Sequence, residues 1–392
     1  MRKEFLSFSP PLIGEEEIEA VVESLRSGWI TTGPRVERFQ SDFKAFVGAP
    51  AALALNSCTS ALHVALAALG IGPGDKVVST PMTFASSIHV IEHVGAQPVL
   101  VDVEQDTLNI DPEKLEAAVR VDPTIKAILP VHLYGHPCEM DAILEIARKH
   151  RLAVIEDAAH SLPARYRGRM IGAPADGDVA NLVAFSFYAT KNLTTGEGGM
   201  LTGPQELIDE SRIWSLHGMS RDAFKRYTSE GSWYYEVVRP GFKYNMPDVQ
   251  AAMGVEQLAK LPQMQRRRHE IVDQYHEAFG AMDAIELPVE RPHVESAWHI
   301  YALRLKLDAL KVDRAQFIEE LKRRNIGSSV HFIPVHLHPY YRDKYGFAPD
   351  AFPVAFREYQ RLVSVPLSPK LTDDDVADVI EAVDDIARTY AR

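Results

Sequence analysis

From about residue 50 to residue 200 the chain alternates between short apolar runs and longer amphipathic segments. Ala51–Leu55 and Leu152–Asp157 have the length and apolar content of buried strands, whereas Thr59–Leu69 and Met140–His150 have the residue spacing of helices. Strands joined through helices require right-handed crossovers, and the helices then cover both faces of the sheet. The alternation therefore predicts an α/β fold with a mostly parallel sheet.

Two later apolar runs depart from this rhythm. Val179–Phe187 and Met200–Gly203 are expected to be strands, but no long helical segment separates them, so part of the sheet is expected to be antiparallel. After residue 205 the pattern changes again. Trp214–Asn245 is rich in Tyr, Trp, Arg and Gly and predicts a long irregular excursion.

Two helices are expected to follow this excursion. The first begins at Pro247 and is closed or kinked at Pro262, because proline lacks a backbone N–H. The second covers Met264–Phe279 and leads into a C-terminal region of strands and helices. We therefore expect a large domain at residues 1–255, including an N-terminal arm, and a smaller domain at 256–392 with a linking helix.

Charge and cysteine content exclude several classes of protein. The formal net charge of −12 argues against a protein that coats nucleic acid, since such proteins bind through clustered cations. Two cysteines cannot form a disulfide framework, and neither has the spacing of a metal ligand. The N-terminus lacks the apolar core of a secretory signal, and the apolar runs are too short to span a bilayer. A cytoplasmic location without membrane partners is expected.

The first strand–helix junction carries small hydroxyl residues. Asn56–His63 reads NSCTSALH, and Thr59 and Ser60 in it lie where a helix is expected to begin. Hydroxyl groups and free N–H groups at a helix start suit an anion such as a phosphate. The alternative is ordinary capping of the helix, for which serine and threonine are preferred in any case.

Asp157 ends one of the expected strands. Ligands of open α/β sheets bind beyond the carboxyl ends of strands, and a carboxylate buried there needs a cationic partner such as a protonated ring nitrogen. Asp157 could equally be a helix N-cap. His160 follows three residues later and could face the same cleft, although an ordinary hydrogen-bonded histidine is the alternative.

Lys191 lies between the apolar run Phe185–Phe187 and the glycine-rich turn GEGG. Partial desolvation lowers the pKa of a lysine and makes it a nucleophile toward carbonyl groups. Most lysines instead lie on solvated surfaces. Ser186 adds a hydroxyl for an anion. Together, these three features suit pyridoxal phosphate. The hydroxyl-rich helix start suits its phosphate, Asp157 suits its protonated ring nitrogen, and Lys191 suits its aldehyde.

Several longer motifs resemble one family. GWITTGP at 28–34, SCTSALHVAL, EDAAH at 156–160, FSFYATKN at 185–192, GEGG and GFKYNMPDVQAAMG at 241–254 are similar to the DegT/DnrJ/EryC1/StrS sugar aminotransferases, in collinear order over nearly the whole chain. This resemblance implies fold type I of the pyridoxal phosphate enzymes. It implies a large domain with a mostly parallel sheet of the seven-stranded type, a small C-terminal α+β domain, and a homodimer with active sites at the subunit interface.

The resemblance also assigns roles around the cofactor ring. Lys191 matches the lysine that forms the Schiff base, and Asp157 matches the carboxylate that pairs with the pyridine nitrogen. Phe84 in PMTFASS matches the aromatic residue that stacks on the ring. His160 occupies a position near the ring hydroxyl that is Gln or His in family members. Dehydratases of the family carry His in place of the lysine, so Lys191 favours transamination.

Four residues match the phosphate site of the family. Thr59 and Ser60 match the phosphate-binding junction, and Ser186 matches a further phosphate ligand. Asn245 matches an asparagine that reaches the phosphate from the neighbouring subunit. The cofactor implied is pyridoxal 5′-phosphate, which becomes pyridoxamine phosphate in the second half-reaction.

Other segments resemble enzymes that aminate C4 of nucleotide-linked 4-keto sugars, of the UDP-4-amino-4-deoxy-L-arabinose aminotransferase type. These segments are WITTGP, HGMSRDAF at 217–224, AWHIY at 297–301 and VHFIPVHLHPYY at 330–341. The expected reaction uses L-glutamate as amino donor and yields 2-oxoglutarate. A 3-keto sugar substrate, a dehydratase and a non-catalytic sensor of sugar nucleotides are the alternatives. The expected substrate residues are Trp29, Thr31, Arg221, Arg226, Arg239, Lys243, His331 and His336, the histidines being equally open to a structural role.

Overall fold

The computed structural model describes residues 2–174, 177, 179–220 and 234–392. Its centre is a seven-stranded sheet in the order β1-β9-β8-β5-β4-β2-β3. The strands are β1 (Ala51–Leu55), β2 (Lys76–Ser79), β3 (Gln97–Leu100), β4 (Ile125–Ile128), β5 (Ala153–Asp157), β8 (Asn181–Ser186) and β9 (Gly199–Gly203). Only β9 runs antiparallel to its neighbours, because no crossover helix joins it to β8. The predicted α/β class and the antiparallel part of the sheet are confirmed.

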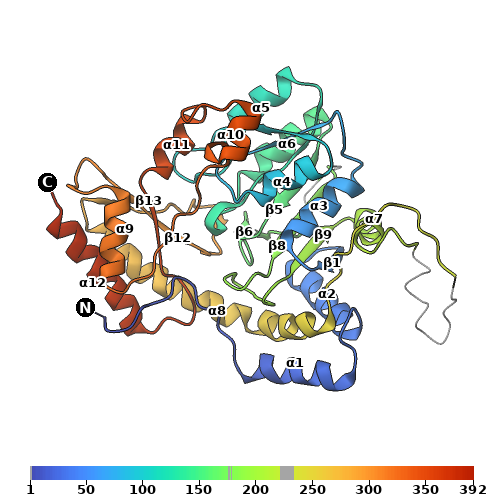
Figure 1. The fold of residues 1–392 in the computed structure, drawn as a ribbon, viewed down its shortest axis with the longest axis horizontal. Helices are drawn as coiled ribbons and strands as arrows, with labels where there is room; N and C mark the ends of the chain where they lie inside the picture. Colours follow the sequence, from blue (N-terminus) through green and yellow to red (C-terminus); the bar gives the residue numbers. More distant parts are fainter. Residues whose placement is uncertain (1, 175–176, 178, 221–233) are drawn as a thin grey trace.

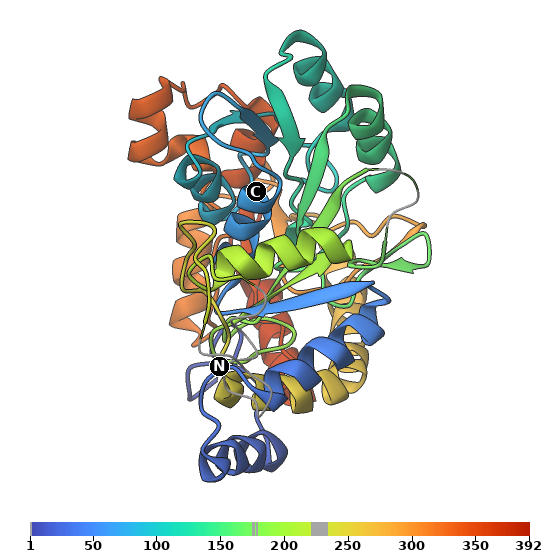
Figure 2. The same ribbon diagram turned by 90° about the vertical axis from the view of Figure 1, so that its right-hand side faces the viewer.

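Helices cover both faces of this sheet (Figures 1 and 2). Strand β1 is wholly apolar because both of its faces are buried. Leu53 packs into the hydrophobic core on one face of the sheet, and Ala54 packs into the core on the other face. The helices on the Leu53 side are α3 (Cys58–Ala68), α4 (Ser86–His93) and α7 (Gln205–Ser215). On the Ala54 side lie α2 (Pro34–Val47), α5 (Pro112–Val121) and α6 (Met140–His150).

One uninterrupted helix, α8 (Asp248–Gly280), replaces the two helices expected here. Pro262 lies inside it, so the expectation of two helices with the first closed at this proline is wrong. The ring is on the exposed side of the helix, while Leu261 and Met264 beside it are buried in the large core. Proline costs one backbone hydrogen bond, and packing on both sides of it keeps the helix continuous. Helix α1 (Glu15–Ser27) packs against α8.

The C-terminal region forms a second core with the end of α8. A sheet of β10 (Ile285–Glu286), β12 (Tyr301–Leu305) and β13 (Leu362–Val365) packs with α9 (Arg314–Arg323) and α12 (Asp373–Thr389). A third, small sheet contains β6 (Arg165–Tyr166), β7 (Arg169–Met170) and β11 (Val294–Glu295). The N-terminal arm joins the second core through Leu6.

Two short C-terminal helices pack outside this second core. They are α10 (Pro339–Tyr345), whose Tyr341 is buried among residues of α3 and α4, and α11 (Pro353–Tyr359), whose first N–H groups are bound by the carboxylate of Asp102. The division at residue 255 stays a prediction. Within the parts of the chain that the structure describes, no helix is both long enough and apolar enough to cross a lipid bilayer.

Candidate active site

Three parallel strands end at one edge of the sheet and bring the expected cofactor residues together. Asp157 is the last residue of β5, Ser186 is the last of β8, and the chain leaves β1 directly into α3. Gly199, the first residue of β9, pairs with both Leu55 and Ser186. A Cβ atom at Gly199 would lie 2.4 Å from the carbonyl carbon of Ser57, so only glycine permits this close approach.

Lys191 lies in the loop between β8 and β9. Its side chain is partly buried, and burial lowers the pKa of its amine to about 8, although the nearby charge of Asp157 opposes the shift. Nζ makes no hydrogen bond or ion pair with the described residues. The backbone N–H of Lys191 donates to the carbonyl of Tyr188 at 2.9 Å. An amine that is half neutral near pH 8 is suited to attack a carbonyl group.

Asp157 is 5% exposed and forms no ion pair with the described residues. Its Oδ2 accepts a hydrogen bond from the Ser87 hydroxyl at 2.7 Å, and its Oδ1 accepts one from the Ala159 N–H at 3.1 Å. A turn rather than a helix follows, so the alternative of a helix N-cap is wrong. A buried carboxylate with only neutral partners fits a protonated pyridine nitrogen as the missing cation.

At the junction between β1 and α3, one serine caps the helix while other polar groups remain free. Ser57 is the N-cap of α3, since its Oγ accepts from the Ser60 N–H at 3.0 Å. The Ser60 hydroxyl donates to Asn56 Oδ1 at 2.6 Å. The Thr59 hydroxyl has no partner among the described residues. The first N–H groups of a helix lack intrahelical acceptors, so this junction fits a phosphate beside Ser186.

His160 is buried and held as a neutral donor. Its Nδ1 accepts a hydrogen bond from the Tyr134 N–H at 3.2 Å, which places the proton on Nε2. Burial, reinforced by the charge of Lys191, lowers the pKa of His160 well below its ordinary value. Its ring stacks on Phe332 with 5.7 Å between centroids, and Phe332 lies 6.0 Å from the ring of Phe84.

Phe84 is 63% exposed at the start of α4, three residues before Ser87. Its role as the residue that stacks on the cofactor stays a prediction. Sequence reasoning missed Phe332 and Tyr134. Neither carries a charge, and although Phe332 lies in the segment VHFIPVHLHPYY, its place and that of Tyr134 beside His160 come from contacts distant in the chain.

Asn245 lies beside β1 of its own chain, bridged to Leu55. Its amide donates to the Thr32 hydroxyl at 2.7 Å, and the Thr31 carbonyl accepts from the first N–H of α8 at 2.9 Å. Trp29 is about half exposed in the same segment. The expected reach of Asn245 to the phosphate of a neighbouring subunit stays a prediction.

Of the expected cationic substrate residues, Arg239 and Lys243 are exposed in the segment that leads to α8. Arg239 pairs with Glu210 at 3.2 Å, and the Lys243 amine donates to Asn245 Oδ1. Arg221 and Arg226 lie outside the described residues. The two described cations therefore lie beside the Asn245 segment, but each already has a partner.

The two histidines of the C-terminal motif separate in the structure. His331 adjoins Phe332, and its carbonyl accepts from the Tyr134 hydroxyl. Burial lowers the pKa of His331 to about 4. His336 is fully buried, and its Nε2–H donates to the Pro349 carbonyl at 3.0 Å. The expectation of a substrate contact at His336 is wrong in this structure, because its side chain is enclosed in the core.

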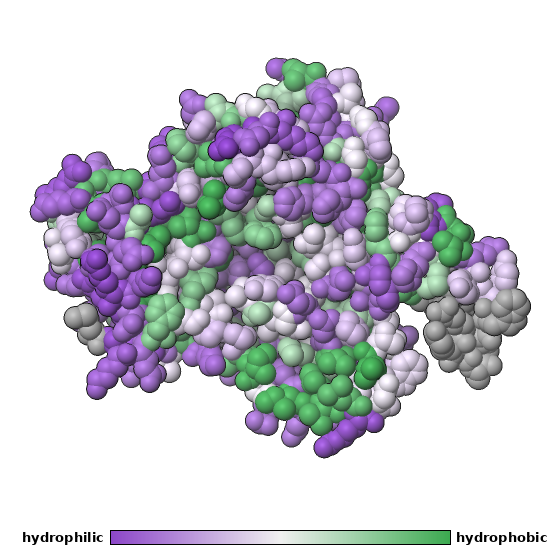
Figure 3. All heavy atoms as spheres, in the orientation of Figure 1, coloured by the Kyte–Doolittle hydropathy of each residue, from purple (hydrophilic) through white to green (hydrophobic). Residues whose placement is uncertain are grey.

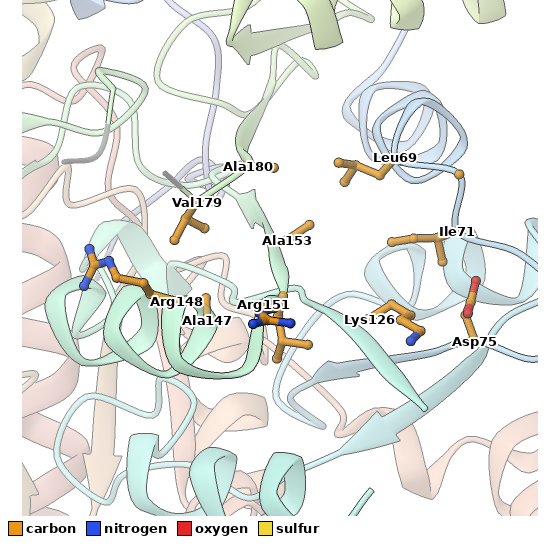
Figure 4. Close-up of a pocket in the computed structure, with 12 residues that line it drawn as sticks. Leu69, Ile71, Asp75, Lys126, Ala147, Arg148, Arg151, Ala153, Val179 and Ala180 are labelled. Carbon is orange, nitrogen blue, oxygen red and sulfur yellow. The ribbon is translucent and has the colours of Figure 1, made fainter. Parts of the chain in front are cut away.

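A large cavity among the described residues lies elsewhere. It has a volume of about 680 Å³ and opens at the amino ends of β4, β5 and β8, where Lys126 and Arg151 line it (Figure 4). Asp157 and Ser186 end the same strands at the opposite edge. The cavity therefore takes no part in the site. Among the described residues, the site is marked by Asp157, which has no cationic partner, and by Lys191, whose Nζ has no hydrogen bond.

Comparison with known proteins identifies the family of the chain. Residues 11–384 match the model of the DegT/DnrJ/EryC1/StrS aminotransferase family. The chain is 53% identical to the spore coat polysaccharide biosynthesis protein SpsC of Bacillus subtilis, over 99% of this chain and 98% of that protein.

Two solved structures extend the comparison. The putative sugar aminotransferase Spr1654 of Streptococcus pneumoniae, in its PMP form, has a TM-score of 0.91 and 36% identity, covering 98% of this chain and 99% of that one. DesV of S. venezuelae, in complex with a ketimine intermediate, has a TM-score of 0.85 and 35% identity, covering 95% and 94%. Spr1654 also has a PLP form. The expected fold type and cofactor are confirmed. The chain belongs to the DegT/DnrJ/EryC1/StrS aminotransferase family of pyridoxal phosphate-dependent sugar aminotransferases.

Proposed function

We propose that this protein transfers the amino group of L-glutamate to C4 of a UDP- or dTDP-linked 4-keto sugar in the cytoplasm. The observation that carries the transamination is the placement of a partly desolvated lysine near a buried carboxylate without a cation, Lys191 and Asp157. The name of SpsC and the sugar aminotransferases among the solved structures support a sugar substrate.

The residues at this edge of the sheet have separate roles in the proposed reaction. When bound, pyridoxal phosphate supplies a ring that accepts the electron pair released at the Cα atom of the amino donor. Lys191 Nζ, when neutral, takes the proton from that Cα atom as general base. Asp157 keeps the ring nitrogen protonated. Thr59, Ser60 and Ser186 would hold the phosphate, and His160, with its proton on Nε2, would lie near the ring hydroxyl.

The presence of Lys191 disfavours the alternative of a dehydratase, since that reaction in the family uses His at this position. A sensor without catalysis has no use for a lysine whose pKa is lowered to about 8. A 3-keto sugar is distinguished only by direct assay. For the diphosphate we propose Arg221, Arg226, Arg239 and Lys243, because a protein of net charge −12 needs local cations to bind it. Trp29, Thr31 and His331 are proposed to contact other parts of the substrate.

A substrate panel tests this function. The purified protein, loaded with cofactor, is assayed with UDP- and dTDP-linked 3-keto and 4-keto sugars and L-glutamate. We expect a new amino sugar and 2-oxoglutarate in equal amounts, with a 4-keto sugar as the best substrate. Mass spectrometry of the product measures the result. Amination only of 3-keto sugars would correct the position, and loss of water without amine uptake would indicate a dehydratase.

We further propose a homodimer that buries the outer side of α1. This helix projects from the body of the molecule, and Figure 3 shows a hydrophobic patch over it. The exposed apolar residues of α1 and of the segments on either side of it are between 38% and 57% exposed: Ile13, Ile18, Leu25, Trp29 and Ile30. Contiguous exposed apolar side chains of this kind mark protein interfaces. The patch adjoins the Trp29–Thr32 segment, so a second subunit seated there lies next to the Asn245 region.

The double variant Ile18→Asp/Leu25→Asp is expected to be monomeric and at least ~10-fold less active, because two charges in an apolar interface prevent its burial. Light scattering after size-exclusion chromatography measures the mass. Val121→Asp is the matched control, since Val121 is an isolated side chain that is 75% exposed. An active double variant that keeps the mass of the wild type would reject α1 as the interface.

A further inference from the structure

Arg268 of α8 is buried without a carboxylate partner among the described residues. It is 2% exposed, and its Nη1 donates to the Trp298 carbonyl at 3.3 Å and to the Leu367 carbonyl at 3.1 Å. Its Nε has no hydrogen-bond partner in the described part of the chain. Burial lowers the pKa of this guanidinium to about 9. A buried cation is costly unless it is paired, so a bridge to two backbone carbonyls requires an explanation.

The Trp298 carbonyl is connected through hydrogen bonds to Asn192, the residue after Lys191. Trp298 precedes His299, whose Nδ1–H donates to Asn192 Oδ1 at 3.1 Å. Asn192 directly follows Lys191, and its amide donates to the Leu162 carbonyl at 3.0 Å and to the Ala297 carbonyl at 2.8 Å. The residue after Lys191 is thus fixed by side-chain bonds to the segment that Arg268 holds.

The Leu367 carbonyl is connected through hydrogen bonds to Thr190, the residue before Lys191. Leu367 precedes Ser368, whose hydroxyl donates to the Pro10 carbonyl at 2.7 Å. Ser9, next in the N-terminal arm, donates its hydroxyl to the Thr190 carbonyl at 3.3 Å. Both backbone neighbours of Lys191 are therefore connected, through short series of hydrogen bonds, to the two acceptors of one guanidinium.

We propose that Arg268 is a positioning residue that clamps the backbone on both sides of Lys191 and so keeps its amine partly dehydrated near Asp157. The guanidinium suits this task, because one nitrogen, Nη1, carries two N–H donors in a fixed plane and its bonds to both carbonyls are charge-assisted. The proposal rests on the proposed function only in taking Lys191 as the reactive amine.

The test compares Arg268→Met and Arg268→Lys with Arg266→Met, in the full chain. Arg266 is the matched control, because it is an exposed residue of the same helix. Hydrogen–deuterium exchange of the holoenzyme reports the clamp directly. The amides of Lys191 and Thr195, which bond within the loop at 2.9 Å, are expected to exchange at least ~10-fold faster in Arg268→Met. Arg268→Lys is expected to restore part of the protection, and Arg266→Met to match the wild type.

A second measurement reports the consequence for the amine. Lys191 of the cofactor-free protein is acetylated over a range of pH and quantified by peptide mass spectrometry. In the wild type the reaction is expected to rise with a midpoint near pH 8, since only the neutral amine reacts. In Arg268→Met the midpoint is expected to move up by about one pH unit, toward that of a solvated lysine.

Each other outcome overturns a stated claim. Unchanged exchange and an unchanged midpoint in a folded Arg268→Met protein would reject the clamp. Failure of both Arg268 variants to fold would show that this arginine supports the whole domain junction, and the clamp would again be rejected. A wild-type midpoint near that of free lysine would contradict the reactive amine, while the exchange data would still decide whether Arg268 holds the loop.

Discussion

Lys191→Ala is expected to abolish transamination, with a fall in kcat of roughly 10²–10⁴-fold or more, because the variant lacks both the covalent anchor and the general base. Cofactor binding is expected to survive in part, since the α3 junction and Ser186 bind the phosphate independently of the lysine. Stopped-flow absorbance after mixing with L-glutamate measures the half-reaction, and the bound cofactor is quantified after denaturation.

Lys126→Ala is the matched control for this variant. Lys126 is exposed and lines the cavity at the opposite edge of the sheet, so its loss is expected to leave kcat unchanged. Added small primary amines are expected to restore part of the activity of Lys191→Ala by acting as base in its place. Appreciable turnover by the variant without added amine would contradict the role of Lys191.

Asp157→Asn is expected to lower kcat by about 10²–10³-fold, the range found when one preorganised electrostatic partner is removed. The asparagine keeps the shape and can still accept from Ser87, but its neutral amide no longer stabilises a protonated ring nitrogen. Steady-state kinetics with both substrates measures the effect, with KM expected to change far less than kcat.

Ser87→Ala separates the charge of Asp157 from its orientation. It removes the 2.7 Å hydrogen bond to Oδ2 and leaves the carboxylate in place, so a loss of about 10-fold or less is expected from one hydrogen bond. A wild-type kcat in Asp157→Asn would show that the carboxylate does not support the chemistry. Equal losses in both variants would show that orientation, rather than charge, is what Asp157 needs.

Sequence reasoning predicted those parts of the site whose location follows from the end of a strand or from a neighbouring apolar run. Asp157 ends an apolar run, and ligands of open α/β sheets bind beyond such strand ends, so the pattern alone predicted its place at this edge. Ser186 was assigned to the phosphate through the family resemblance, and the structure shows that it ends β8. The lowered pKa of Lys191 agrees with the expected desolvation of a lysine beside an apolar run.

Other parts depend on tertiary packing that no local pattern shows. The continuous helix α8 keeps Pro262 because buried neighbours outweigh one lost hydrogen bond. His336 shares a motif with His331 but enters the core, since side-chain direction there is set by packing against distant aromatic residues. Tyr134 bonds to a ring nitrogen of His160 and to the His331 carbonyl, and Arg268 bonds to two backbone carbonyls. These partners lie far away in the chain, so residue spacing does not predict the contacts.

Chemical trapping tests the central claim most directly. The holoenzyme is treated with sodium borohydride, digested and analysed by mass spectrometry, so that any bond between a lysine amine and the aldehyde carbon of the cofactor becomes a stable adduct. The account predicts a pyridoxyl group on Lys191 alone, and no adduct in protein first converted with L-glutamate. An adduct on a different lysine, or none in the resting enzyme, would contradict it.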